Sequence, residues 1–276
     1  MKPPPLDYLR PETLGGALDA LRAGPEVTVI AGGQSLLPML SLRVTSPSLL
    51  VNLARLPELR LSEAAPDAMR IGAATTHAEI EDGKVPDPSR GMMAAVAAGI
   101  AYRAVRNFGT IGGAVALSDP AADWPACLVA LGAAAILAGP ERERRMPVAD
   151  FVLGPYTTAL QPREVVLAFE IPALGPQARW GWKKLARKRG AYADSIGAVV
   201  RPGLGAAPRV VLGATGDRPW LLDRVSRVMT EQALSRPVLR EVITDEIRTF
   251  DPSIDSYRLR CHVAMVERAI FEASAP

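Results

Sequence analysis

Two Gly-Gly pairs, Gly32-Gly33 and Gly112-Gly113, lie about 80 residues apart in this chain of 276 residues. Because glycine has no Cβ atom, such a pair permits positive φ angles and lets the backbone approach another group closely. A single Gly-Gly pair after a strand is typical of an ordinary turn. Two pairs with polar neighbours require a fold that either uses both as turns or brings them together around a ligand.

The first pair follows a short apolar run, residues 27–30, which we predict to be a buried strand. Successive N–H groups after this strand form an anion-binding nest, and the Ser35 hydroxyl adds a donor. Such a turn suits a pyrophosphate, although it is not a GxGxxG sequence and lacks the lysine of a P-loop. The candidate binding residues of this first glycine motif are Val29, Ile30, Ala31, Gly32, Gly33, Gln34, Ser35 and Leu36.

The second pair belongs to residues 106–114, the second glycine motif, which we expect to be a loop. Thr110 offers a hydroxyl here, and Asp119 and Asp123 follow shortly afterwards. Because carboxylates are poor partners for phosphate, we assign Asp123 to a hydroxyl or ring N–H of a ligand; Asp119 could equally cap a turn or the next helix. Together the two motifs predict a clamp for a long ligand with a diphosphate and a polyol.

The hydrophobic pattern predicts an α+β fold in two parts, with a linker at residues 172–176. The expected domains are residues 1–172 and residues 177–276, the second being a three-stranded antiparallel sheet with a helical bundle. Aromatic residues make up only 5% of the chain and apolar residues 49%, so small aliphatic side chains must fill the core. Strands are predicted at residues 27–30, 49–52, 70–73, 133–137, 165–171, 180–185, 196–200 and 210–214, and helices at residues 14–21, 77–82, 92–100 and beyond 219.

Composition argues against several classes of protein. The net charge of +3 is spread along the chain without a basic block, which gives nucleic-acid binding little support. The longest uncharged stretch, residues 124–140, is too short for a membrane span and is predicted to be a buried helix and strand. Cys127 and Cys261 are the only cysteines, so we expect a reducing cytoplasm and no cysteine-bound iron–sulfur cluster. With only two histidines, a metal site is not expected, and residues 1–5 do not resemble a signal peptide.

Four isolated residues have competing interpretations. His77 could approach a ligand, but a helix-start or surface histidine is the more common case. Cys127 is expected in the core. Tyr192 could shield a cofactor or pack locally. Lys184 belongs to a basic cluster that could be merely solvated.

The segments AGGQSLLP (31–38), RNFGTIGG (106–113) and DPAAD (119–123) resemble the FAD-binding medium subunit of molybdenum hydroxylases, of the carbon monoxide dehydrogenase and xanthine dehydrogenase type. The similarity continues through residues 72–75 and 184–187, so it covers almost the whole chain. Ala114 departs from an Asn or Asp that is frequent in this family, and Ser41 departs from a frequent Lys. The four-cysteine insertion of iron–sulfur-containing relatives is absent.

This resemblance implies a two-part FAD-binding domain (PCMH-like) that holds FAD noncovalently. The pyrophosphate would lie on residues 32–35, with the second glycine motif closing from the other side. The remaining implied cofactor contacts are Thr75, Thr110, Ile111, Gly112, Gly113, Ala114, Asp123 and Lys184. No residue of this chain is expected to act catalytically on an organic substrate.

The resemblance also implies partners and a role. A large subunit would carry the molybdenum cofactor, and a small subunit would carry two-iron iron–sulfur clusters, in a dimer of heterotrimers. This chain would take electrons from the small subunit and pass them to NAD, oxygen or a quinone. One alternative is a stand-alone FAD-dependent oxidase or dehydrogenase of a small alcohol. A second alternative is a non-catalytic subunit whose cofactor site has decayed.

Overall fold

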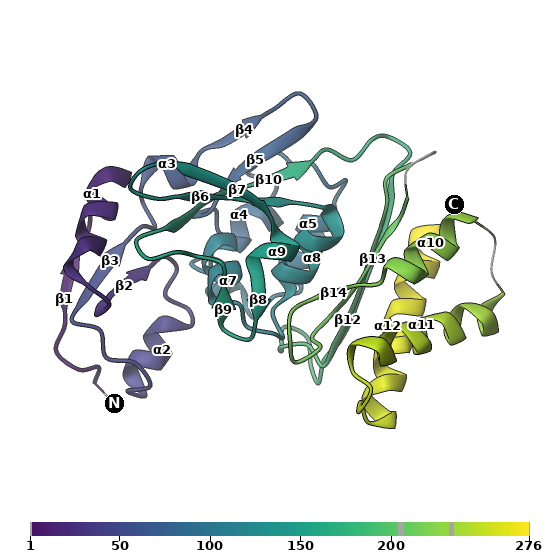
Figure 1. The fold of residues 1–276 in the computed structure, drawn as a ribbon. Helices are drawn as coiled ribbons and strands as arrows, with labels where there is room; N and C mark the ends of the chain where they lie inside the picture. The colour runs from purple at the N-terminus through teal and green to yellow at the C-terminus, as the bar shows by residue number, and fades with distance from the viewer. Residues whose placement is uncertain (1, 204–206, 232–234, 276) are drawn as a thin grey trace.

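The N-terminal part of the chain is a small α/β unit on a three-stranded parallel sheet, at the left of Figure 1. The computed structural model describes residues 2–203, 207–231 and 235–275. The sheet has the order β1-β3-β2, and the Thr13 side chain caps the first helix by accepting from the Gly16 amide. The elements are β1 (Asp7–Leu9), α1 (Leu14–Ala20), the 3-10 helix η1 (Leu21–Ala23), β2 (Val27–Ile30), α2 (Leu36–Ser41) and β3 (Leu49–Asn52).

The middle of the molecule contains a five-stranded antiparallel sheet of order β4-β5-β10-β6-β7, with most of the short helices on one face. Its central strand β10 faces two cores: Phe169 and Ile171 pack with the helices, whereas Leu167 packs toward the N-terminal unit. The elements are α3 (Pro57–Arg60), β4 (Ser62–Ala64), β5 (Ala68–Gly72), α4 (His77–Glu81), α5 (Met92–Ala98), α6 (Arg103–Arg106), α7 (Ile111–Leu117), α8 (Asp123–Leu131), β6 (Ala134–Ala138), β7 (Glu143–Pro147), α9 (Val148–Phe151), the hairpin of β8 (Val152–Gly154) and β9 (Thr157–Thr158), and β10 (Val165–Pro172).

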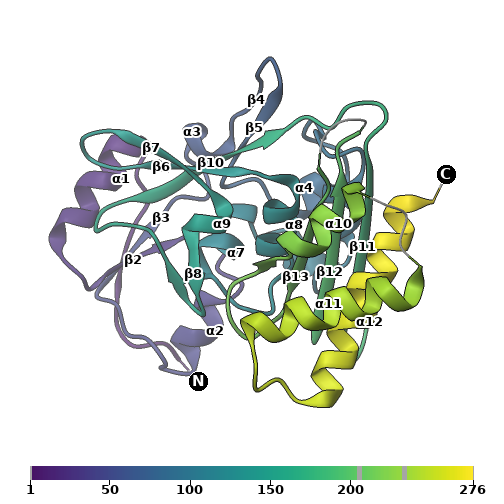
Figure 2. The ribbon, with the colours of Figure 1, turned by 45° about the vertical axis from the view of Figure 1, so that its right-hand side comes forward.

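The C-terminal part is an antiparallel sheet of order β11-β12-β13-β14 with three helices on its outer face, at the right of Figure 1 and in front in Figure 2. The three predicted strands are confirmed, and the two-residue strand β14 adds a fourth. The elements are β11 (Arg179–Leu185), β12 (Ser195–Arg201), β13 (Arg209–Gly213), β14 (Trp220–Leu221), α10 (Asp223–Glu231), α11 (Arg236–Phe250) and α12 (Ser256–Ser274).

Helix α8 joins the middle of the molecule to the C-terminal sheet. All nine of its residues are buried, as the uncharged stretch predicted. Ala198 and Val200 on the inner face of β12 belong to the same core as Trp124 of α8, whereas Val199 faces the outer helices. The predicted linker therefore separates β10 from β11 along the chain, but the hydrophobic core continues across it. The division into residues 1–172 and 177–276 stays a prediction.

The long helix α12 lies directly on glycines of the C-terminal sheet. A Cβ atom on Gly181 would lie 2.0 Å from the Ala269 carbonyl oxygen, and one on Gly197 would lie 2.3 Å from that of Met265. These two strand positions therefore admit only glycine while the helix stays in place.

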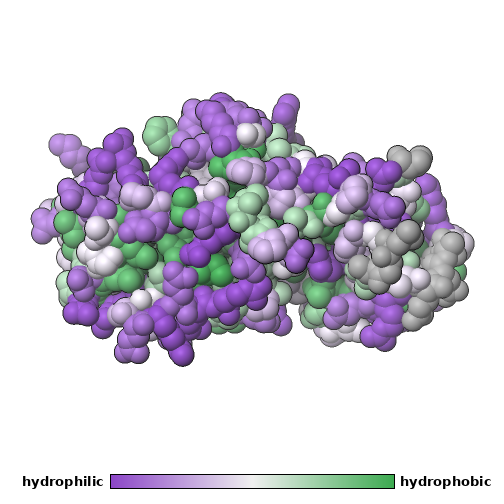
Figure 3. Space-filling view, turned by 90° about the horizontal axis from the view of Figure 1, so that it is seen from above, coloured by the Kyte–Doolittle hydropathy of each residue, from purple (hydrophilic) through white to green (hydrophobic). Residues whose placement is uncertain are grey.

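None of the described helices is both long and apolar enough to cross a membrane. On the face seen in Figure 3, hydrophilic side chains surround smaller apolar patches.

Candidate functional site

The first glycine motif forms the turn between β2 and α2. Gly33 has a φ of +70°, as a left-handed turn requires, and a Cβ atom on Gly32 would lie 2.0 Å from the Phe108 carbonyl oxygen. The first motif therefore touches the second through backbone atoms. Among the described residues, the amides of Gly32, Gly33, Gln34 and Ser35 donate to no acceptor, which leaves four N–H groups for a ligand.

The loop predicted for the second glycine motif is confirmed for residues 107–110 and was wrong for residues 111–114, which are helical. Helix α7 begins at Ile111, and the Thr110 hydroxyl caps it by accepting from the Gly113 amide at 3.0 Å. The Gly112 amide donates to the Ala73 carbonyl at 2.9 Å, and a Cβ atom on Gly112 would lie 2.5 Å from the Ala73 Cβ. Glycine disfavours a helix, but at this position only glycine lets α7 pack closely against Ala73, in the chain after β5. Gly112 therefore serves close packing, and its amide is already used.

One cavity of about 330 Å³ is shared by both glycine motifs. Its wall contains every residue from Val29 to Leu36, together with Thr110, Gly112, Gly113 and Ala114. Two predicted contacts, Thr75 and Ile111, are absent from this wall and buried, with the Ile111 amide bonded to the Thr75 carbonyl at 3.0 Å. A neighbouring pocket shares Gly32 and Thr110 with this cavity and adds two cationic side chains, Arg55 and Arg60.

Asp123 and Lys184 form an ion pair outside this cavity wall. Asp123 lies in the first turn of α8 and Lys184 in β11, with 2.9 Å between Nζ and Oδ2. The Lys184 side chain is only 13% exposed, so the solvated interpretation of this lysine was wrong. Burial raises the pKa of Asp123 to about 6, and the Lys184 ammonium opposes that rise. This pair links the middle of the molecule to the C-terminal sheet.

A second polar neighbourhood contains Asp119, Tyr156 and Tyr192. Asp119 accepts from the Ala121 amide at 2.9 Å, which is the turn cap that the sequence allowed, and also from the Tyr156 hydroxyl at 3.3 Å. Partial burial and the Asp119 carboxylate raise the pKa of Tyr192, and the Ser35 hydroxyl opposes the rise. Tyr192 is 62% exposed, so it does not pack away from solvent. Cofactor shielding by Tyr192 stays a prediction.

His77 lies closer to the candidate site than its sequence context predicts. It begins α4, as one interpretation expected, but it is only 5% exposed and lies on the wall of the shared cavity. Its Nδ1 accepts a hydrogen bond from the indole N–H of Trp124 at 3.0 Å. The sequence shows only a histidine at the start of a predicted helix. This pattern does not predict a contact with Trp124, which is 47 positions away. Cys127 is fully buried in α8, as expected.

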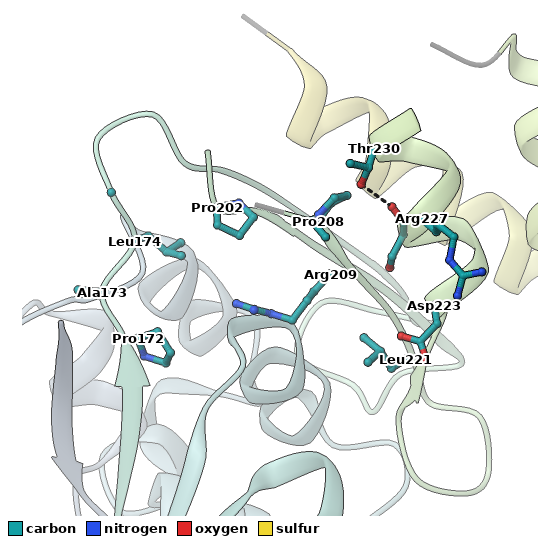
Figure 4. A pocket seen from close by; sticks show the side chains of 13 residues that line it. Pro172, Ala173, Leu174, Pro202, Pro208, Arg209, Leu221, Asp223, Arg227 and Thr230 are labelled. Atoms are coloured by element: carbon teal, nitrogen blue, oxygen red, sulfur yellow. Dashed lines mark hydrogen bonds between the residues drawn. The ribbon is translucent and has the colours of Figure 1, made fainter. Parts of the chain in front are cut away.

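A larger cavity, of about 820 Å³, lies away from both glycine motifs (Figure 4). It is bordered by residues 172–175, by the start of β13 and by α10. The Arg209 side chain at its edge donates to the carbonyls of Ala130 and Leu131 at 2.8 and 3.0 Å. This arginine is therefore committed to the end of α8, and no predicted site residue borders this cavity.

The shared cavity fits part of an FAD molecule. Four unpaired amides in one turn suit a pyrophosphate, which offers several acceptor oxygens, and the glycines keep the backbone accessible. In the described part of the chain, no three His, Cys, Asp or Glu side chains gather in the way a metal ion requires.

Comparison with known proteins gives a consistent result. Residues 4–174 match the family model described as the FAD binding domain in molybdopterin dehydrogenase. The carbon monoxide dehydrogenase medium chain of Hydrogenophaga pseudoflava is 32% identical and covers 100% of this chain and 99% of its own length. The glyceraldehyde dehydrogenase medium chain of Sulfolobus acidocaldarius is also 32% identical, and 92% of each chain is covered.

Solved structures agree with this similarity. A carbon monoxide dehydrogenase from Hydrogenophaga pseudoflava superposes with a TM-score of 0.91, at 31% identity and over 99% of each chain. Quinoline 2-oxidoreductase from Pseudomonas putida 86 superposes with a TM-score of 0.88, at 30% identity, over 99% of this chain and 98% of the other. This chain therefore belongs to the family of FAD-binding medium subunits of molybdenum hydroxylases, and its cofactor is FAD.

Proposed function

We propose that this chain is the electron-transfer flavoprotein subunit of a heteromeric molybdenum hydroxylase. FAD supplies the chemistry of accepting single electrons from iron–sulfur clusters and releasing them as a pair. In this proposal an iron–sulfur subunit donates the electrons, and NAD, oxygen or a quinone receives them. A molybdenum-containing large subunit carries out substrate chemistry, and two heterotrimers form a dimer in a reducing cytoplasm.

The observation that carries the proposal is the set of unpaired amides at residues 32–35, on a cavity that both glycine motifs share. In this proposal these amides hold the pyrophosphate, and the Thr110 hydroxyl, which accepts from Gly113, still has its proton to donate. Residues 29–36, Thr110, Gly113 and Ala114 contact FAD directly. Gly112, Thr75 and Ile111 hold α7 against the chain after β5, and so act through packing.

The Asp123–Lys184 pair is proposed to serve the flavin end of the cofactor. When both groups are ionised, their attraction at 2.9 Å offsets part of the desolvation cost of burying the lysine. A cation held near the flavin favours the anionic reduced form, as expected of a subunit that must accept electrons readily.

The alternative, a stand-alone oxidase of a small alcohol, needs a base beside the flavin. The one histidine on the cavity wall has its Nδ1 occupied by Trp124, and its pKa is lowered to about 4 by burial and by Arg106. A base with that pKa is poorly matched to proton abstraction near neutral pH. This observation favours electron transfer over direct substrate oxidation.

Flavin reduction in the isolated chain tests the proposal. The purified chain is denatured with acid, and FAD is expected in the supernatant because its binding is noncovalent. The native holoprotein is then mixed anaerobically with carbon monoxide, glyceraldehyde, nicotine, caffeine and quinoline, compounds that the names of its relatives contain. We expect no flavin bleaching with any of them and full bleaching with dithionite.

Reconstitution supplies the positive arm of this test. Co-expression with the proposed molybdenum and iron–sulfur subunits should yield a complex whose flavin is bleached by at least one such compound. Rapid bleaching of the isolated chain by an organic compound would support the oxidase alternative instead. Absence of FAD from every preparation would support the second alternative, a non-catalytic subunit that no longer binds the cofactor.

A further inference from the structure

His77 lies on the wall of the shared cavity, and the edge of its ring that carries Nε2 lies next to Gly109. A Cβ atom on Gly109 would lie 2.8 Å from Nε2 and 2.9 Å from Cδ2, so only a glycine leaves room for the ring at this position. Both His77 and Gly109 line the cavity. The His77 amide donates to the Gly109 carbonyl at 2.9 Å, which holds the two residues together.

Trp124 determines which ring nitrogen of His77 carries the proton. An indole N–H can only donate, so Nδ1 must accept and the neutral ring carries its proton on Nε2. In the described part of the chain, Nε2 has no hydrogen-bond acceptor, although the side chain is only 5% exposed. Nε2 is not one of the fully buried polar atoms that lack a partner among the described residues, so this donor is accessible to a ligand that enters the cavity.

The donor lies beside the unpaired amides of the first glycine motif. Gly109 and Phe108 are next to each other, and the Phe108 carbonyl oxygen lies against Gly32. Residues 32–35, whose amides are free, and His77 therefore line one cavity. We propose that the Nε2–H of His77 donates a hydrogen bond to a phosphate oxygen of the FAD pyrophosphate. This inference rests on the proposed cofactor site at the first glycine motif.

The electrostatics of the site agree with a neutral donor. Burial, followed by the Arg106 guanidinium, lowers the pKa of His77 to about 4, so the ring is uncharged near neutral pH. Arg106 itself is paired with Glu81 at 2.8 Å, and the carboxylate on the cavity wall, Glu164, is paired with Arg144 at 2.7 Å. No lysine or arginine side chain is among the described residues that line this cavity. Neutral N–H groups therefore supply the recognition of the pyrophosphate inside it.

Two substitutions separate the two nitrogen atoms of the ring. In His77→Asn the amide reaches the position of Nδ1, so it can accept from Trp124 but offers nothing at Nε2. In His77→Gln the amide nitrogen reaches the position of Nε2, while the acceptor for Trp124 is lost. The matched control is His262→Asn, which changes the other buried histidine, located in α12 and bonded to Ser195 at 2.7 Å.

FAD affinity is measured by flavin fluorescence titration of the apoproteins. We expect FAD to bind His77→Asn roughly 10- to 100-fold more weakly than wild type, the usual effect of losing a hydrogen bond to a charged group. His77→Gln should keep most of the affinity but unfold at a lower temperature, and His262→Asn should bind FAD like wild type. Equal affinity of wild type and His77→Asn would overturn the inference, as would equal losses in His77→Asn and His262→Asn. Failure of wild type to bind FAD would instead count against the proposed cofactor site.

A measurement on the wild-type protein does not depend on variants that fold. Nitrogen-15 NMR of the His77 ring should show an unprotonated Nδ1 and a protonated Nε2 in the apoprotein. FAD should then shift the Nε2–H resonance and slow its exchange with water. A proton on Nδ1, or an Nε2–H resonance that FAD leaves unchanged, would contradict the proposed bond.

Discussion

Gly33 is the second glycine of the first glycine motif and Gly112 is the first of the pair in the second motif, and the two glycines serve different purposes in the structure. Gly33 adopts a φ of +70°, which an L side chain rarely adopts, and it borders the cavity. Gly112 also lines the cavity, but it lies in a helix and its Cβ position meets Ala73. The sequence shows a glycine at both positions and does not distinguish the two roles. Each role depends on which atoms of the folded chain lie near the position where a Cβ atom would be.

Replacement of Gly33 by alanine should lower both stability and FAD affinity. The positive φ costs roughly 1–3 kcal/mol for a residue with a Cβ atom. The new methyl group would also lie 3.0 Å from a Leu37 side-chain atom and disturb the turn that carries the free amides. The control is Gly83→Ala, because Gly83 has a φ of +65° and nothing within 4 Å of its Cβ position. Chemical denaturation should show that the free energy of unfolding falls in both variants because of the positive φ. FAD titration should show a loss of affinity only in Gly33→Ala.

The two histidines should make the apoprotein less stable as the pH falls from 6.5 toward 4. Burial lowers the pKa of His77 and of His262 to about 4, whereas both titrate near 6.5 when unfolded. Between these values the unfolded chain binds protons that the folded chain does not, so acid favours unfolding by up to about 3 kcal/mol per histidine. Asp123 acts in the opposite direction, because its pKa is raised to about 6 in the fold. Urea unfolding at pH 7.5 and pH 5.0 measures the change, which should be smaller in His262→Asn.

Secondary structure was predictable in segments whose own sequence pattern favours one structure without contacts to the rest of the chain. Residues 27–30 and 49–52 form strands as predicted because each is a short apolar run between turn residues. Helix α8 was predictable because an uncharged stretch of that length must be buried. Helix α7 was not predictable, because two glycines disfavour a helix and only contact with Ala73 offsets that cost. For the same reason, the approach of α12 to Gly181 and Gly197 could not be predicted from either segment alone.

Helix α7 should lose its packing against the chain after β5 when Gly112 becomes alanine. The added methyl group would lie 2.5 Å from the Ala73 Cβ and 2.6 Å from its carbonyl oxygen, so backbone must move. Overpacking of this kind typically costs about 1–3 kcal/mol. Gly15→Ala in α1 is the control, because its nearest neighbour is 4.0 Å away and alanine favours helices. Denaturation of the apoproteins should show a lower free energy of unfolding for Gly112→Ala and no decrease for Gly15→Ala. Equal free energies of unfolding in the two variants would mean that α7 can shift away from Ala73 without destabilising the protein.

The whole molecule depends on contacts that no single segment predicts. The candidate site draws on the turn after β2, on α7, on α8 and on β11, and the sequence predicted most of its members through a family resemblance. The cavity wall formed by residues 160 and 164–166 was not predicted, because those residues carry no glycine or hydroxyl signal. The contact between His77 and Trp124 depends on two helices that meet only in the folded chain.

A fragment of residues 1–175 should not fold as a stable FAD-binding domain. Removal of β12 and β13 would expose α8, of which every residue is buried in the full chain, and would remove Lys184 from Asp123. Each large apolar side chain uncovered costs roughly 1.5–3 kcal/mol, which is a large share of the stability of a domain. We expect an aggregating or partly folded product in circular dichroism and gel filtration. A monomeric, cooperatively unfolding fragment that binds FAD would show that the predicted domain boundary is also a folding boundary.

Lys184→Met tests the electrostatic link between the two parts of the molecule. Methionine keeps the length of the side chain but leaves the Asp123 carboxylate buried without its cation, which typically costs about 3–5 kcal/mol. The pKa of Asp123 should then rise above its present value of about 6. A carboxyl whose pKa is raised by folding makes the protein less stable as the pH rises toward that pKa, so the variant should lose stability relative to wild type between pH 6 and 8. Asp123→Asn in the Lys184→Met background removes the uncompensated charge and should restore much of the loss and abolish the new pH dependence. Additive effects of the two substitutions in a double-mutant cycle would instead mean that the 2.9 Å contact contributes no coupling between β11 and α8.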